Sequence, residues 1–194
     1  MTAQMSDIAR YQGKDYALAG VRGEGMFSPE AHGLQPRGTC TACWRGYVCT
    51  YAVTDETLLL DQLAINLGDP KIRDGTLRSP LLNGVERASG PGHFFDSQYV
   101  NVGLVVAFSG GLLIARGFIK ELYVHMGFHP AWKYEEVHEL LFDRGRLTKA
   151  RDVSAMLREF RESMRDRQLE PGHEASRRDI AQWVERCFSL DYRM

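Results

Sequence analysis

The sequence lacks an excess of charge of either sign. Its 194 residues include 24 lysines and arginines against 25 aspartates and glutamates, which gives a formal net charge of -1 at pH 7. Proteins that bind nucleic acid through its phosphates usually carry a basic excess, so we expect no nucleic-acid partner. Hydrophobic residues make up 44% of the chain, which is too high a share for a disordered protein. We therefore expect one globular domain.

The sequence also lacks a clear membrane-spanning or secretory segment. The longest apolar-rich stretch, YVNVGLVVAFSGGLLIA, covers residues 99–115, and Asn101, Ser109 and Gly110-Gly111 interrupt it. This pattern predicts two buried strands rather than a membrane helix. Residues 1–20 contain no apolar run of the length that a signal peptide needs. We therefore expect a cytoplasmic protein that does not associate with a membrane.

Cysteine is scarce: the chain has Cys40, Cys43, Cys49 and Cys187. A structural zinc ion needs four ligands, and C-x-x-C supplies two of them from Cys40 and Cys43. No second pair at similar spacing completes the set, so Cys40 and Cys43 are metal candidates without a full ligand set, and we expect no bound metal and no cofactor. A thioredoxin-like pair sits at a helix N-terminus, whereas this pair precedes a predicted strand. Cys49 and Cys187 fall on apolar faces and are interpreted as small core residues.

Motifs for nucleophilic catalysis and phosphate binding are missing as well. There is no G-x-S-x-G, no G-x-x-x-x-G-K-[ST] and no G-x-G-x-x-G. One alternative remains open, a small enzyme with its site between the 19–41 loop and a corner at His125. Its candidate groups are His125, Glu135, Glu136, Arg45 and Asn101, because a histidine near carboxylates can act as a general base. The same histidine can equally be a structural, hydrogen-bonded residue.

What the sequence does contain is a strong β pattern. In WRGYVCTYAV, Tyr47, Cys49, Tyr51 and Val53 alternate with smaller residues, which predicts a strand with one buried face. Turn residues between similar runs predict three hairpins, over 7–18, 44–66 and 134–153. The Ser109-Gly110-Gly111 sequence predicts a further tight turn, and 118–126 predicts another strand.

The last forty residues change to helical spacing. Val153, Met156, Leu157, Phe160 and Met164 form one stripe, with Asp152 or Ser154 as the cap, and a second helix is predicted from Ser176. The predicted fold is α+β: a strongly bent antiparallel β-sheet or partial barrel over residues 1–151, packed by a C-terminal helical hairpin over 152–194. Residues 1–143 hold 12 basic and 16 acidic residues, while residues 144–194 hold 12 and 9, so the helical part is mildly basic.

Three segments also carry a resemblance: TACWRGYVCTYAVTDETLLLDQLAI, FSGGLLIARGFIKELYVHMGF and YEEVHELLFDRGRLTKARDVS. Together they resemble a group of small bacterial proteins with a W-R-G-Y strand and a Y-V-H-M-G corner. The resemblance covers about half of the chain and implies β-hairpin pairing. It implies no catalytic residue.

Balanced charge, missing catalytic motifs and two long predicted loops, over 19–41 and 67–97, favour binding over catalysis. We expect a non-enzymatic bacterial partner-binding protein, for example an immunity or antitoxin-like inhibitor or an accessory protein, with self-association left open. Trp44, Arg45 and Tyr47 are the candidate binding residues. The alternative interpretation is that this cluster anchors the start of a strand by cation–π packing.

Overall fold

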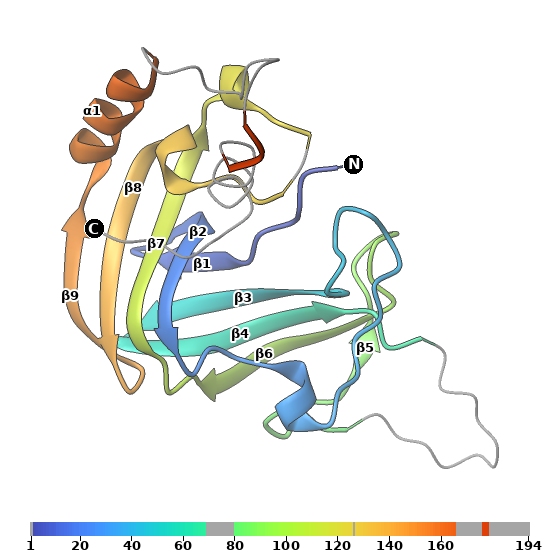
Figure 1. Ribbon diagram of the computed structural model, residues 1–194. Helices are drawn as coiled ribbons and strands as arrows, with labels where there is room; N and C mark the ends of the chain where they lie inside the picture. Colours follow the sequence, from blue (N-terminus) through green and yellow to red (C-terminus); the bar gives the residue numbers. More distant parts are fainter. Residues whose placement is uncertain (1, 69–79, 126, 166–175, 179–194) are drawn as a thin grey trace, which may run out of the picture.

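Seven strands close into a barrel in the computed structural model, which describes residues 2–68, 80–125, 127–165 and 176–178 (Figure 1). Around the barrel they follow the order β1 (Ile8–Tyr11), β2 (Lys14–Glu24), β7 (Ser109–Phe118), β8 (Tyr134–Asp143), β9 (Arg146–Asp152), β4 (Thr57–Ile65) and β3 (Tyr47–Thr54). Strand β4 changes partner along its length. Its first residue pairs with β9, and the rest pairs with β6 (Ser97–Val105), on which β5 (Ala88–Ser89) is added.

The barrel is mixed, so the prediction of an antiparallel sheet was wrong in one pairing. Strand β1 is antiparallel to β2 but parallel to β3, with Ile8 opposite Thr50 and Arg10 opposite Ala52. Residues 25–46, which include the 3₁₀ helix η1 (Pro29–His32), form a long connection that returns the chain in the same direction as β1. This pairing also closes the sheet, which is therefore a complete barrel rather than a partial one.

The three predicted hairpins are confirmed as β1–β2, β3–β4 and β8–β9. The predicted turn at Ser109-Gly110-Gly111 is wrong, because these residues belong to β7, which pairs with β2 and β8 and not with β6. The glycines serve a different purpose. A Cβ on Gly110 would lie 2.0 Å from the Arg22 carbonyl oxygen, so glycine permits the close approach of β2 and β7.

Over the residues that the structure describes, the fold is mostly β with a small helical part, rather than the predicted α+β sheet with a helical hairpin. Helix α1 (Ser154–Arg165) follows β9 directly, and Asp152 Oδ1 accepts a hydrogen bond from the Ser154 amide at 2.9 Å. The predicted second helix lies outside the described residues apart from 176–178. The predicted strand over 118–126 is also wrong. There the chain leaves β7 and forms the 3₁₀ helix η2 (Lys120–Leu122), with a further 3₁₀ helix, η3 (Ala131–Lys133), just before β8.

The main core is the barrel interior. Inward side chains of β3 include Cys49 and Tyr51, which are almost fully buried as the alternation predicts. A smaller cluster on the outer face of β7 and β8 includes Val137 and Val153 and is covered by Leu157 of α1. Close packing on both faces makes β7 and β8 a rigid support for residues at their ends. Within the described ranges, no helix has both the length and the apolarity required to cross a bilayer.

Candidate functional site

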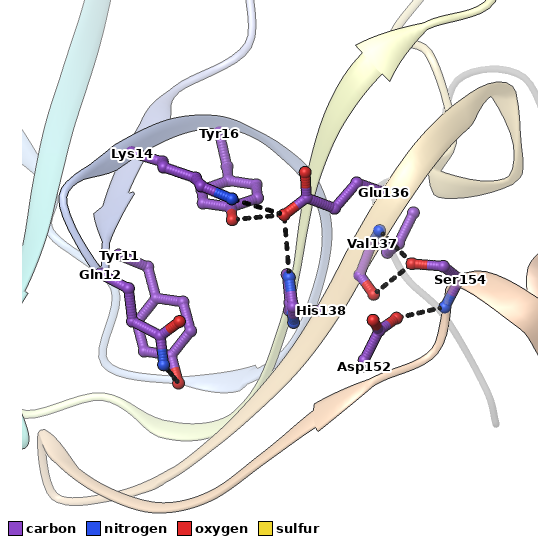
Figure 2. A network of polar contacts seen from close by, with 9 residues as sticks. All are labelled: Tyr11, Gln12, Lys14, Tyr16, Glu136, Val137, His138, Asp152 and Ser154. Carbon is purple, nitrogen blue, oxygen red and sulfur yellow. Dashed lines mark hydrogen bonds and ion pairs between the residues drawn. The ribbon is translucent and has the colours of Figure 1, made fainter.

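Polar side chains from β2 and β8 converge on one carboxylate at the end of the barrel interior (Figure 2). The Tyr16 hydroxyl on β2 donates a hydrogen bond to Glu136 Oε1 on β8 at 2.7 Å. His138 Nε2 lies 3.3 Å from the same oxygen, and Lys14 Nζ lies 3.6 Å from it. The rings of Tyr11 on β1 and Tyr16 contact His138 edge-on, with centroid distances of 6.0 and 5.5 Å. We call these five residues the Glu136 network.

Strand alternation explains why the network forms there. Positions 136, 138, 140 and 142 share one face of β8, and Leu140 and Phe142 belong to the barrel core. Glu136 and His138 continue that inward face beyond the apolar part. On β2, Tyr16 stands in the same relation to the core residue Leu18. The network therefore terminates the apolar interior with groups that satisfy one another.

The pKa values of Glu136 and Tyr16 are both shifted away from neutral pH. Hydrogen bonds from Tyr16 and then His138 lower the pKa of Glu136 and outweigh the opposing effect of burial. Burial, and next the hydrogen bond to Glu136, raise the pKa of Tyr16 to about 12. A general acid or base works best with a pKa near the working pH. Glu136 and Tyr16 are instead held as carboxylate and neutral phenol, which suits fixed polar contacts better than proton transfer.

The residues predicted as an enzyme site lie in separate places. Glu136 belongs to the network, whereas Glu135 points to the opposite face of β8 and lies against Gly117. His125 is exposed and packs edge-on against Tyr123 at 4.8 Å. Asn101 is an exposed residue of β6 with a φ of 57°.

Arg45, the last of that predicted set, holds the N-terminal segment. Its Nη1 and Nη2 donate to Asp7 Oδ2 and Oδ1 at 2.9 and 2.5 Å, and the Cys49 amide donates to Asp7 Oδ1 at 2.6 Å. Burial opposes the charge on Arg45, but Asp7 outweighs it and raises the pKa of the guanidinium. The guanidinium also lies 4.7 Å from the centre of the Tyr47 ring, which is a cation–π contact at the start of β3 between two residues of the predicted cluster.

Trp44, next to Arg45, is different because its side chain is 56% exposed. Phe94, on an adjoining loop, is 53% exposed. Asn66 joins the two loops: its Nδ2 donates to Thr39 Oγ1 at 2.8 Å and to the Phe94 carbonyl at 2.9 Å. A Cβ on Gly38 would lie 2.4 Å from the Trp44 carbonyl oxygen, so the 38–39 segment packs against the Trp44 backbone and is linked through Asn66 to the Phe94 backbone. We call Trp44 and Phe94, with the loops that carry them, the aromatic loop surface.

The cysteine pair occupies the turn just before Trp44. Cys43 is buried and its Sγ donates to the Tyr47 carbonyl oxygen at 3.3 Å, while Cys40 is partly exposed. Both are free thiols, as is Cys49. Among the described residues, no three histidine, cysteine or acidic side chains are grouped so as to hold a metal ion. Cys187 lies outside the described residues.

Sequence analysis did not identify several of the residues that form these sites. His138 and Tyr16 had a usable signal, because they are polar residues in line with the buried positions of their own strands. Asp7 and Phe94 had none, since Asp7 opens the predicted 7–18 hairpin without belonging to its apolar pattern, and Phe94 lies between predicted strands. Comparison of the chain with family models, curated proteins and solved structures gave no match. Function is therefore inferred from the local geometry.

Proposed function

We propose that the chain is a non-enzymatic, cytoplasmic bacterial protein that binds a protein partner through the aromatic loop surface. An immunity or antitoxin-like inhibitor, or an accessory protein, would work in this way. The observation that supports it most is the exposure of Trp44 and Phe94, at 56% and 53%, on loops fastened to each other through Asn66. Tryptophan is among the side chains that dominate binding energy at protein interfaces.

The loops are already ordered by their own contacts, which favours tight binding. The Arg37 amide donates to the Asn66 carbonyl at 2.8 Å, and the Asn66 amide donates to the Gly46 carbonyl at 2.8 Å. Asp96 accepts hydrogen bonds from the amides of Leu67 and Gly68 at 3.1 and 2.8 Å. A partner would therefore lose little free energy in ordering the loops, and the buried aromatic area would contribute directly to affinity.

The test is affinity purification from the native host with matched surface variants. Wild type, Trp44→Ala and Phe94→Ala are compared with Val105→Ala, which removes an equally exposed apolar side chain, 57% exposed, from β6. We expect one protein to be enriched with wild type and Val105→Ala. Loss of a central aromatic residue should weaken its binding by about 2 kcal/mol or more, roughly thirtyfold. If nothing is enriched, or if the aromatic variants retain the partner fully, the proposal fails.

Light scattering on the purified protein across a range of concentrations distinguishes self-association from binding to a different protein. A dimer that dissociates in Trp44→Ala but not in Val105→Ala would identify a second copy as the partner. If the protein is a monomer at all concentrations, the partner of the aromatic loop surface is a different protein.

A second candidate function is enzymatic and rests on His138. Its Nε2 lies 3.3 Å from the Glu136 carboxylate, an arrangement that orients an imidazole for proton transfer. His125 packs instead against an aromatic ring. Alanine variants at both positions, assayed on ester, phosphate and glycoside substrates with melting temperatures measured in parallel, distinguish the roles. An enzyme would lose activity in His138→Ala at nearly unchanged melting temperature, whereas loss of stability alone would indicate a structural histidine.

A further inference from the structure

We infer that Cys40 and Cys43 are a thiol–disulfide site, in which Cys40 reacts with a hydroperoxide and Cys43 closes an intrachain disulfide. This modification site goes beyond the proposed function and does not depend on it. Its support comes from the turn that carries the two thiols, from their unequal exposure, and from the contacts that hold the turn in place.

The turn places the two cysteines within bridging distance. The Cys43 amide donates to the Cys40 carbonyl at 3.3 Å, and the two residues are opposite each other in an antiparallel bridge. A four-residue turn of this kind brings its first and fourth Cα atoms within about 7 Å. A disulfide needs a Cα separation of about 4.4–6.8 Å, so no rearrangement of the fold is required.

The N-terminal segment fixes this turn from outside. The Met5 amide donates to the Ala42 carbonyl at 2.8 Å, and Gln4 Nε2 donates to the Thr41 carbonyl at 2.7 Å. Because both middle residues of the turn are held, the thiols remain neighbours in the reduced protein. Ring closure therefore loses little conformational entropy.

The two thiols differ in the way that a reacting and a resolving cysteine should. Cys40 is partly exposed and can be reached by a small oxidant. Cys43 is buried, and burial raises the pKa of its thiol, which keeps it protonated and unreactive toward solvent. Cys49 is completely buried, with a pKa raised well above its ordinary value for the same reason. Oxidation should therefore begin at Cys40.

The chemistry balances with a hydroperoxide as the oxidant. The Cys40 thiolate attacks the peroxide, the O–O bond breaks, an S–O bond forms, and hydroxide or alkoxide leaves. The resulting sulfenic acid is attacked by the Cys43 sulfur, which forms the S–S bond and releases water that includes the Cys43 thiol proton. A dithiol reductant reverses the reaction by exchange. Reversible, regulatory disulfides are the type found in reducing compartments.

Closure would also change the start of β3. The Cys43 sulfur would leave the Tyr47 carbonyl, which now accepts its hydrogen bond at 3.3 Å. Trp44 follows Cys43 directly, and its amide is held by a hydrogen bond to Gln4 Oε1 at 3.2 Å. Because a moved Cys43 sulfur changes the surroundings of the neighbouring Trp44, we expect the Trp44 contribution to the fluorescence to respond to the redox state while the barrel stays folded.

The test uses the full-length protein, reduced and then treated with one to a few equivalents of hydrogen peroxide. Free thiols are alkylated and the intact mass is measured. We expect a loss of about 2 Da before alkylation, two fewer alkylated cysteines, a cross-linked peptide containing Cys40 and Cys43, and full reversal by dithiothreitol. Far-UV circular dichroism should not change.

Two variants assign the roles. Cys43→Ser should stop at the sulfenic acid, with a gain of about 16 Da that dimedone traps. Cys40→Ser should react at least about tenfold more slowly than wild type. Equal reaction of Cys40→Ser, or a disulfide that involves Cys49 or Cys187, would overturn the assignment. The wild-type peptide map identifies the disulfide even if a variant fails to fold. The result does not depend on partner binding, so a failure to find a partner by affinity purification would not affect it.

Discussion

Replacing Arg45 with alanine should destabilise the protein by about 3–5 kcal/mol, because it leaves the buried Asp7 carboxylate without its counterion. Asp7 is only 6% exposed and receives both Arg45 Nη groups, at 2.9 and 2.5 Å. The Cys49 amide, its other partner, is neutral and cannot replace the lost charge. The large effect comes from the unpaired carboxylate rather than from the net contribution of the ion pair.

An exposed pair supplies the control. Arg146 Nη2 lies 3.1 Å from Glu56 Oε2, and both side chains are mostly in water. Arg146→Ala should therefore change stability by less than about 1 kcal/mol. The two variants remove the same side chain from ion pairs that differ chiefly in burial.

Urea unfolding at pH 7, followed by circular dichroism, measures both. For Arg45→Ala we expect a midpoint about 1–2 M lower at unchanged slope, and a melting temperature about 6–20 °C lower. The double variant Asp7→Ala/Arg45→Ala should lose less than the sum of the single changes, because it leaves no unpaired charge. If Arg45→Ala were as stable as Arg146→Ala, or if the two single effects simply added, the reasoning would be refuted.

Gly110→Ala should destabilise the protein by more than about 3 kcal/mol or prevent folding, because its Cβ would meet the Arg22 carbonyl at 2.0 Å. Gly13→Ala, at a φ of +74° with open space around it, should lose only about 1–2 kcal/mol in the same urea titration. The lowered pKa of Glu136 contributes stability that is complete above about pH 4.5 and is lost as the pH falls through the folded value. Acid unfolding of Glu136→Gln should therefore show a flatter pH dependence in that window, and an unchanged curve would contradict it. The pKa of Tyr16, raised to about 12, acts in the opposite direction. Its stability is complete below about pH 10 and is lost between about pH 10 and 12, so Tyr16→Phe should lose less stability than wild type between pH 9 and 11.5.

The hairpins could be predicted because their information is local. In β3 and β4, alternating residues and the turn at Asp55-Glu56 lie in one short segment, and both central turn residues take positive φ values. The prediction of a turn at Ser109-Gly110-Gly111 was wrong because it, too, used only local sequence. Glycines also occur in strands where two backbones approach closely, and only the partner strand distinguishes the two cases.

The candidate sites were predictable only in part. Trp44 was identified as a binding candidate, and the structure shows it exposed beside Arg45, which is paired with Asp7. The Glu136 network was not identified, because its central hydrogen bond joins residues 120 positions apart. Histidine near acidic residues in sequence drew attention to His125, yet the carboxylate contact belongs to His138.

The sequence by itself determined the three local hairpins and the buried face of β3, because alternation and turn chemistry act over a few residues. Tertiary structure alone decided the parallel pairing of β1 with β3, the closure of the barrel, and the meeting of Tyr16 with Glu136. These features depend on which strand edges remain unpaired after the local hairpins have formed. That choice is settled by the packing of the whole interior rather than by any one segment.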